Sequence, residues 1–205
     1  MIEADVFAVY LAAVAAVYLT PGPDMALIMA VSAGNGARAG FCCAGGIAVA
    51  RFAHVMVSGL GLAALLSEQP ALLLAVRGAG AAYLLWLAWK LWRAKPGAAE
   101  QAREELSPWG AVARGFLTNL LNPKALMFCA MLLPQFVSPE RGPLLVQFVW
   151  LGAVLVAAGC LFDAGYVLAA SGLARRVNVS GRLSRVRNKV MGSVFVALAA
   201  RLAAG

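Results

Sequence analysis

Four ionisable side chains stand inside long apolar stretches of this 205-residue sequence. They are two acids, Asp24 and Asp163, and two bases, Arg51 and Lys124. A charge at the centre of a transmembrane helix costs about 2.5–3.5 kcal/mol on insertion scales, so such residues face one another or water. Two acids and two bases together could hold a zwitterion, and one acid could also carry a proton. We therefore expect a polar site, with Asp24, Arg51 and Asp163 as candidates for proton coupling or for an ion pair.

A first interruption is predicted at residues 19–27, which read LTPGPDMAL. Pro21 and Pro23 lack the backbone N–H that a helix requires, and Gly22 permits unusual dihedral angles. Asp24 then falls in the first turn of the next helical piece, where a carboxylate is favoured. This pattern predicts a broken membrane span. A simple kink with Asp24 acting only as a helix cap is the alternative.

A second interruption is predicted at residues 117–124, which read LTNLLNPK. Asn122 suits the N-cap position of a helix, Pro123 suits its first position, and Lys124 follows. Bare backbone at membrane depth is tolerated only where protein or a water-filled cavity satisfies it. Two interruptions therefore indicate one polar cavity, and Asn119 belongs to the same candidate set.

The composition is that of a membrane protein. The chain is 62% hydrophobic and 13% charged, with a mean hydropathy of +0.82, whereas soluble domains have about 45–50% apolar and about 25% charged residues. The N-terminus lacks the basic region of a signal peptide, so we expect the first apolar run to remain as a span. We predict an all-α integral membrane protein, a single transmembrane domain over residues 1–205. Its six transmembrane helices, the first and fourth broken, are expected at residues 6–33, 41–66, 72–92, 115–137, 144–171 and 190–204.

The net charge of +8 is unevenly distributed. Lys and Arg gather in the segments between spans one and two, three and four, and five and six. The positive-inside rule puts these segments in the cytoplasm and both termini outside. The basic segment 175–189 is expected to lie against anionic lipid headgroups. This distribution argues against a nucleic-acid partner.

Helix geometry predicts that the four charges lie at one level. Counting 1.5 Å per residue from the cytoplasmic edge, Asp24 lies about 14 Å deep and Lys124 about 13 Å. Arg51 lies about 15 Å deep and Asp163 about 12 Å by the same count. Arg51 and Asp163 could instead form a purely structural ion pair. His54, at about 20 Å, is interpreted as a helix-packing residue.

Two interpretations of the chain's halves stay open. The third span ends LAWKL and the last ends LAARL, and each half has one broken span. Three spans per half would make an inverted 3+3 repeat, as in many transporters. The matches could equally arise by chance in alanine- and leucine-rich helices.

At these residues the chain resembles the LysE-type exporter family, whose members are described as lysine, homoserine and threonine translocators. The resemblance rests on five segments: LTPGPDMAL at 19–27, GARAGF at 36–41, GLGLAALL at 59–66, AGAAYLLWLAWKL at 79–91 and GFLTNLLNPKALMFCAMLLPQFV at 115–137. It implies small multi-pass carriers of the bacterial inner membrane that expel amino acids from the cytoplasm, driven by the proton gradient. The family's marked residues fall on Pro21, Gly22, Pro23, Asp24, Asn122, Pro123 and Lys124. Ala50-Arg51 departs from the family's glycine and small or polar residue, and this extra cation favours neutral or acidic substrates over lysine-like ones.

The function expected from these observations is proton-coupled export of small amino acids or derivatives, bound between the first and fourth spans. The alternative is an exporter of metal or other inorganic ions on a related scaffold. One His, scattered Cys residues and two midplane acids are too few ligands for that reading. An enzyme is not expected, because no catalytic motif with usable spacing appears. No cofactor or bound metal is predicted, and the oligomeric state, a homo-oligomer included, is left open.

Overall fold

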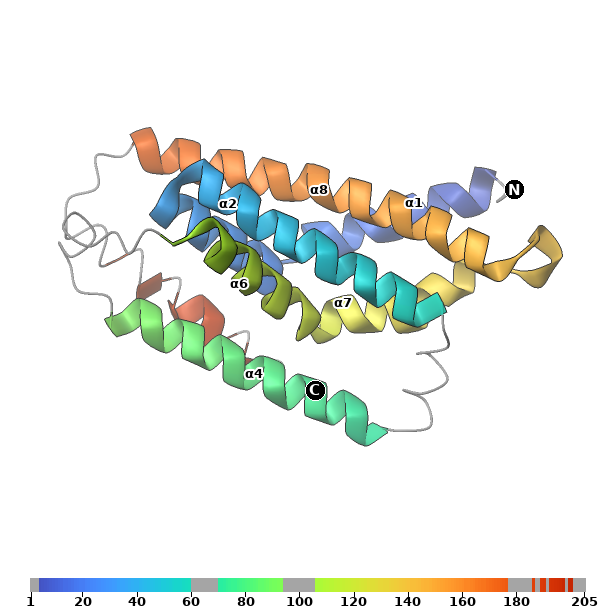
Figure 1. The fold of residues 1–205 in the computed structure, drawn as a ribbon, viewed down its shortest axis with the longest axis horizontal. Helices are drawn as coiled ribbons and strands as arrows, with labels where there is room; N and C mark the ends of the chain where they lie inside the picture. The colour runs from blue at the N-terminus through green and yellow to red at the C-terminus, as the bar shows by residue number, and fades with distance from the viewer. Residues whose placement is uncertain are drawn as a thin grey trace.

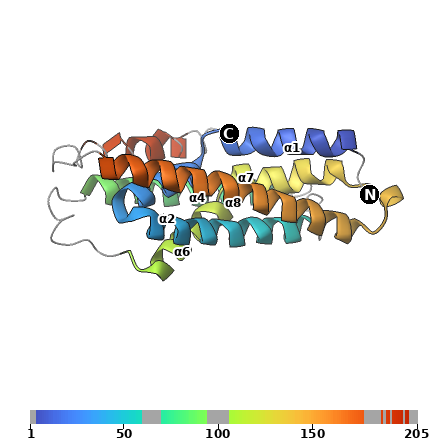
Figure 2. The ribbon, with the colours of Figure 1, turned by 90° about the horizontal axis from the view of Figure 1, so that it is seen from above.

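The protein is all-helical over the residues that its computed structural model describes, which are 4–59, 70–93, 106–176, 186, 189–190, 192–197 and 199–200. Its helices run roughly along the long axis of the molecule (Figure 1 and Figure 2). They are α1 (Ala4–Leu19), α2 (Pro23–Val57), α4 (Pro70–Arg93), α6 (Pro108–Leu120), α7 (Pro123–Met127) and α8 (Leu144–Arg176). A π-helical segment η2 (Phe128–Leu132) and 3₁₀ segments η3 (Leu133–Phe136) and η4 (Pro139–Arg141) connect α7 to α8.

Helix α1 ends where the sequence places two prolines. The last ladder hydrogen bond joins Thr20 N to Ala16 O at 3.0 Å, and Gly22 is fully extended with φ −160° and ψ −179°. Pro21 and Pro23 have no N–H to donate to the carbonyls four residues earlier, so the helical ladder stops. Helix α2 then begins at Pro23, a favoured residue for the first helical position.

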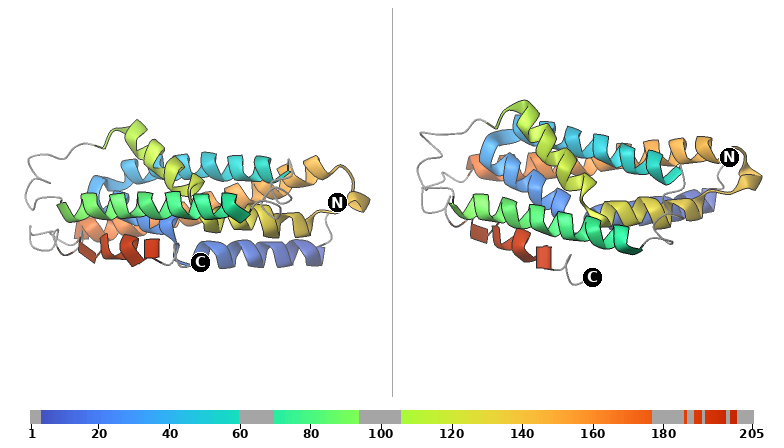
Figure 3. Two further views of the ribbon diagram at one scale, coloured as in Figure 1. Left: turned by 90° about the horizontal axis from the view of Figure 1, so that it is seen from below. Right: turned by 60° about the horizontal axis from the view of Figure 1, so that its bottom comes forward.

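Helix α2 consists of two arms, residues 23–35 and 37–57, joined at Gly36. Gly36 has a positive φ of +85° and non-helical geometry, which glycine adopts without steric cost. A Cβ atom on Gly40 would lie 3.1 Å from Ser32 Cβ, although eight residues of straight helix span about 12 Å. The chain therefore reverses direction, as Figure 3 shows. The tight turn that Gly34-Asn35-Gly36 predicts is reduced to this one non-helical residue.

The second arm of α2 packs closely on α6. A Cβ atom on Gly46 would come within 2.8 Å of the carbonyl carbon of Val112, and one on Gly115 within 2.9 Å of that of Cys43. Backbone meets backbone at both points, and only glycine leaves room for it. This contact fixes the second interruption, at the end of α6, beside the second arm of α2.

Two helix boundaries differ from the sequence prediction. Helix α6 starts at Pro108, well before residue 115, because the Ser107 side chain caps it by accepting from Gly110 N at 3.0 Å. Helix α8 runs on to Arg176, past residue 171, since a helix need not end where apolar residues do. The polar sequence AAEQAREEL at residues 98–106 also predicts a short surface helix, and it lies almost wholly outside the described residues. So do most of the segment GLGLAALL, most of the basic segment 175–189 and the end of the last span.

Within the described residues, two helices are long and apolar enough to cross a membrane, Pro23–Val57 and Leu144–Ala174. A third such unit is the pair Pro108–Leu120 and Pro123–Phe136, bent by 55°. The first of these helices folds back at Gly36, so it is not one straight span. The apolar helices are those of a membrane protein.

Two apolar clusters lie on either side of a polar layer. One contains Ile47 and Val167, and the other contains Val55 and Leu155. Arg51 lies between Ile47 and Val55 along α2, and Asp163 lies between Leu155 and Val167 along α8. The order of residues along each helix therefore places both charges between the two clusters.

Candidate functional site

The first interruption leaves backbone carbonyls without their helical partners, and side chains from other helices bind them. The Thr20 carbonyl oxygen accepts a hydrogen bond from Lys124 Nζ at 2.6 Å, and the Tyr18 carbonyl accepts one from the Tyr166 hydroxyl at 2.8 Å. The Thr20 bond is exposed and the Tyr18 bond partly buried, and each carbonyl needs a hydrogen-bond partner from protein or water. Lys124 of α7 and Tyr166 of α8 therefore stabilise the open backbone between α1 and α2.

The second interruption is satisfied in the same way. The residue four positions after Asn119 is Pro123, which has no N–H to offer the Asn119 carbonyl. That carbonyl instead lies 3.1 Å from His54 Nε2 and accepts from Asn122 N at 3.0 Å. The Asn122 side chain in turn accepts from Lys124 N at 3.1 Å, which confirms Asn122 as N-cap and Pro123 as the first residue of α7.

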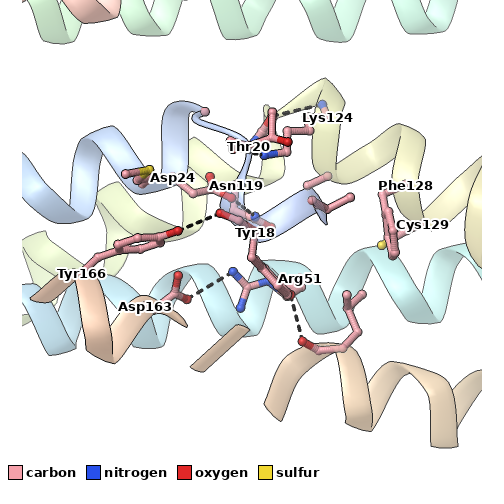
Figure 4. A pocket seen from close by; sticks show the side chains of 16 residues that line it. Tyr18, Thr20, Asp24, Arg51, Asn119, Lys124, Phe128, Cys129, Asp163 and Tyr166 are labelled. Carbon is pink, nitrogen blue, oxygen red and sulfur yellow. Dashed lines mark hydrogen bonds and ion pairs between the residues drawn. The ribbon is translucent and has the colours of Figure 1, made fainter. Parts of the chain in front are cut away.

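The two interruptions hold each other through two hydrogen bonds, here called the reciprocal pair. Lys124, just after the second interruption, donates to Thr20 in the first. Asn119, just before the second, donates from Nδ2 to Asp24 Oδ2 at 2.7 Å. The carboxylate can only accept, so the amide nitrogen must face it. Figure 4 shows both bonds on one side of the pocket. Asp24 is therefore bound to the other interruption, and Gly22 is the N-cap of α2 without a side-chain cap bond.

Arg51 and Asp163 form a buried ion pair beside these bonds. Arg51 Nη2 lies 3.2 Å from Asp163 Oδ2, and each residue is 3% exposed. The guanidinium carbon also lies 4.8 Å from the centre of the Tyr18 ring, within cation–π range. The guanidinium also packs on Gly159, where a Cβ atom would lie 2.6 Å from the guanidinium carbon and 2.6 Å from the Tyr18 hydroxyl. The Tyr18 hydroxyl is fixed by donating to Leu155 O at 2.8 Å.

These groups line one pocket of about 530 Å³, counted with its open mouth. Seven of the ten predicted site residues line it: Gly22, Asp24, Arg51, Asn119, Asn122, Lys124 and Asp163. Pro21 is exposed, while Pro23 and Pro123 are buried and set the starts of α2 and α7. The three prolines therefore do not line the pocket themselves.

Three buried polar atoms of the pocket residues have no hydrogen-bond partner among the described residues. They are the acceptors Asp24 Oδ1 and Asn119 Oδ1 and the donor Arg51 Nη1. Buried polar groups are normally paired, so each unpaired one calls for an explanation. Two acceptors on neighbouring side chains are suited to a ligand that carries an ammonium group.

Three residues of the site were missed by the sequence analysis: Tyr18, Thr20 and Tyr166. Each supplies a hydroxyl or a freed carbonyl to the pocket. Tyr18 and Thr20 could have been found from their place within five residues of Pro21 and Pro23. Tyr166 gives no local signal beyond its place one turn after Asp163. His54, interpreted as a packing residue, is buried as expected but also binds a freed carbonyl.

No group of three or more His, Cys, Asp or Glu residues within the described ranges is placed to hold a metal ion. The cysteines in those ranges are unbridged: Cys42, Cys43, Cys129 and Cys160. The inorganic-ion alternative therefore receives no support from the side chains that the structure describes.

Comparison with known proteins places the chain in a family. The model of the LysE type translocator family matches residues 15–205. The chain belongs to the LysE type translocators. Relatives of this translocator include the homoserine/homoserine lactone efflux protein of Salmonella typhi, 30% identical over 90% of this chain and 89% of the relative. The leucine efflux protein of Klebsiella pneumoniae is 30% identical over 95% and 92%. An uncharacterized membrane protein of Vibrio cholerae is 29% identical over 95% and 94%. No solved structure matches this translocator.

Proposed function

We propose that this LysE type translocator exports small amino acids or their derivatives from the bacterial cytoplasm, in exchange for protons. The observation that carries the proposal is the pocket at which two helix interruptions meet, lined by two acids and two bases. The names of the relatives, efflux proteins for homoserine, its lactone and leucine, support amino acids as substrates. All three molecules carry an α-amino group and have no charged side chain.

Six membrane spans are proposed, with α1 and the first arm of α2 as one broken span. At 1.5 Å per residue, α1 is about 24 Å long and that arm about 20 Å, so neither alone crosses about 30 Å of hydrocarbon. They lie end to end in Figure 3. Helix α6 and the segment Pro123–Phe136 form the fourth span by the same argument. An inverted 3+3 repeat, with both termini outside, is supported by the occurrence of one interrupted span in each half.

The substrate is proposed to bind with its ammonium group at Asp24 Oδ1 and Asn119 Oδ1, the two acceptors that find no partner among the described residues. Its carboxylate is proposed to lie at Lys124 and the start of α7, with Asn122 fixing that end. An ammonium ion has three donors, so Lys124 can bind a carboxylate as well as Thr20 O. Gly22, between Pro21 and Pro23, has no side chain, so the backbone there leaves room for the ligand to reach both the acceptors and Lys124.

The coupling proton is proposed to bind Asp24 or Asp163. Both line the pocket, and each has a second carboxylate oxygen besides the one that contacts Asn119 or Arg51. Loading from the cytoplasm agrees with the positive-inside assignment, which puts the interruptions nearer that side. Anionic lipids at the basic segment 175–189 remain part of the proposal.

Uptake into everted vesicles tests the proposal, because export then fills the vesicle. Asp24→Asn and Lys124→Ala should each abolish accumulation of leucine and homoserine driven by an acid interior, because each removes a proposed ligand group. Glu140→Gln and Arg38→Ala are the matched controls, since both residues lie outside the pocket. Their uptake should equal that of the parent protein at equal amounts in the membrane. Parental uptake in both pocket variants would overturn the assignment.

A further inference from the structure

Arg51 occupies a place in the pocket that is built to hold a cation. The place is bounded by Asp163 Oδ2 at 3.2 Å, by the face of the Tyr18 ring at 4.8 Å and by the bare backbone of Gly159. A carboxylate with an aromatic face is a common arrangement for binding ammonium and guanidinium groups. We call these three residues the cation seat.

Residues outside the cation seat hold its Tyr18 in place. The Tyr18 ring is fixed at its hydroxyl by Leu155 O and at its backbone by the Tyr166 hydroxyl, 2.8 Å in each case. Tyr18 also stacks on Phe162, with ring centres 5.4 Å apart. Contacts other than those with Arg51 therefore hold the Tyr18 side of the seat in place.

Arg51 fills this seat imperfectly. Only Nη2 contacts the Asp163 carboxylate, where an arginine commonly makes two parallel bonds. Nη1 is buried without a hydrogen-bond partner among the described residues. The guanidinium thus takes the place of a bound cation, although it is part of the chain, and its charge cancels that of Asp163.

We propose that Arg51 determines specificity: by filling the cation seat it excludes substrates with a cationic side chain. This inference rests on the proposed function. With Arg51 present the four pocket charges sum to zero, and a neutral zwitterion leaves the sum unchanged. A basic amino acid adds one positive charge next to Arg51 and Lys124, with no acid left to receive it. Without Arg51, Asp163 is a buried carboxylate lacking its partner, and the cationic end of lysine supplies one.

The test is the ratio of lysine to leucine uptake by everted vesicles, measured for the parent protein and Arg51→Ala. A recovered charge contact worth 1.4 kcal/mol changes affinity tenfold, and we expect the ratio to rise by about tenfold or more. The double variant Arg51→Ala with Asp163→Asn keeps the space but removes the charge. Because Asp163 is also a candidate for the coupling proton, this variant is the control for the binding measurement and not for uptake. An unchanged ratio in Arg51→Ala, with leucine uptake still measurable, overturns the inference.

A binding measurement covers the case in which Arg51→Ala accumulates but no longer transports. Methylguanidinium should raise the thermal midpoint of the purified variant in detergent and leave that of the double variant unchanged. L-lysine should raise the midpoint of Arg51→Ala more than that of the double variant, which keeps only the groups proposed to bind its ammonium and carboxylate. No rise in Arg51→Ala overturns the inference. If Arg51→Ala protein does not accumulate in the membrane, Arg51→Gln replaces it. If neither variant accumulates, the Arg51–Asp163 ion pair is needed for folding, and the inference is also overturned. If the parent protein transports no amino acid while methylguanidinium still stabilises Arg51→Ala, the proposed function fails and the seat stands.

Discussion

His54 shows how one buried side chain can repair a helix interruption. Its Nε2 lies 3.1 Å from the Asn119 carbonyl, to which Pro123 cannot donate because proline has no backbone N–H. A bond to a carbonyl requires the hydrogen to be on Nε2, which fixes the tautomer of the ring. Sequence analysis reached the burial of His54 but not this partner, because the partner is sixty-five positions away.

Removing this donor should destabilise the protein. We expect His54→Leu to lower the free energy of unfolding by about 0.5–1.5 kcal/mol, because the Asn119 carbonyl loses one hydrogen bond and keeps the one from Asn122 N. Each kcal/mol corresponds to about 2–4 °C in the melting midpoint of a domain of this size. The measurement is thermal unfolding in detergent. His54→Gln keeps an N–H donor and should lose less, and equal midpoints for both variants would contradict the assigned hydrogen bond.

The four charged pocket residues show where residue-level prediction succeeds and where it ends. Their common level follows from counting residues along helices, and they do line one pocket. Their partners do not follow from counting, because the Asn119–Asp24 and Lys124–Thr20 contacts depend on how separate helices pack. No local pattern distinguishes Asp24 as a helix cap from Asp24 as the acceptor of Asn119.

At the scale of elements, the crossing of α2 and α6 depends on two glycines. Gly46 and Gly115 face backbone carbonyl groups of the opposite helix. Gly45, one residue earlier, faces open space, because a Cβ atom added there would have no other atom within 4 Å. The two neighbouring glycines therefore form a natural comparison.

Substituting these neighbours should have opposite effects. Gly46→Ala forces the two helices apart and should cost about 1–3 kcal/mol, as overpacking commonly does. Gly45→Ala should be neutral or stabilise by up to about 1 kcal/mol, the difference in helix propensity. Melting midpoints in detergent decide between these outcomes. Equal stability of the two variants would mean that the helices do not approach as closely as the structure has them.

Helix starts were predictable where proline and a capping residue coincide. Helices α2, α6 and α7 all begin at a proline, and Ser107 and Asn122 cap the last two. The start of α6 was nevertheless placed too late, since apolar content was used to locate it and Arg114 lies within the helix. The π-helical segment η2 has no sequence signal, and one of its carbonyls, Cys129 O, accepts a hydrogen bond from the distant Ser58 hydroxyl.

At the scale of the whole molecule, the proposed six-span arrangement predicts on which side of the membrane each end of the chain lies. Alkaline phosphatase fused after the C-terminus should be active in bacteria, because that enzyme folds only outside the cytoplasm and both termini are expected there. A fusion truncated at Arg93 should be inactive, since the segment after α4 is assigned to the cytoplasm by its basic residues. The reverse pattern would contradict the orientation, and activity in both fusions would contradict the number of spans between them.

The reciprocal pair has a consequence for how such a carrier would work. In the proposed function, the amino acid binds the same Asp24 and Lys124 side chains that join one interruption to the other. It uses the second carboxylate oxygen of Asp24 and a further hydrogen of Lys124, so a bound amino acid would add a link between the two halves of the chain. The side chains that hold the empty carrier together would then be the ones that detect its substrate.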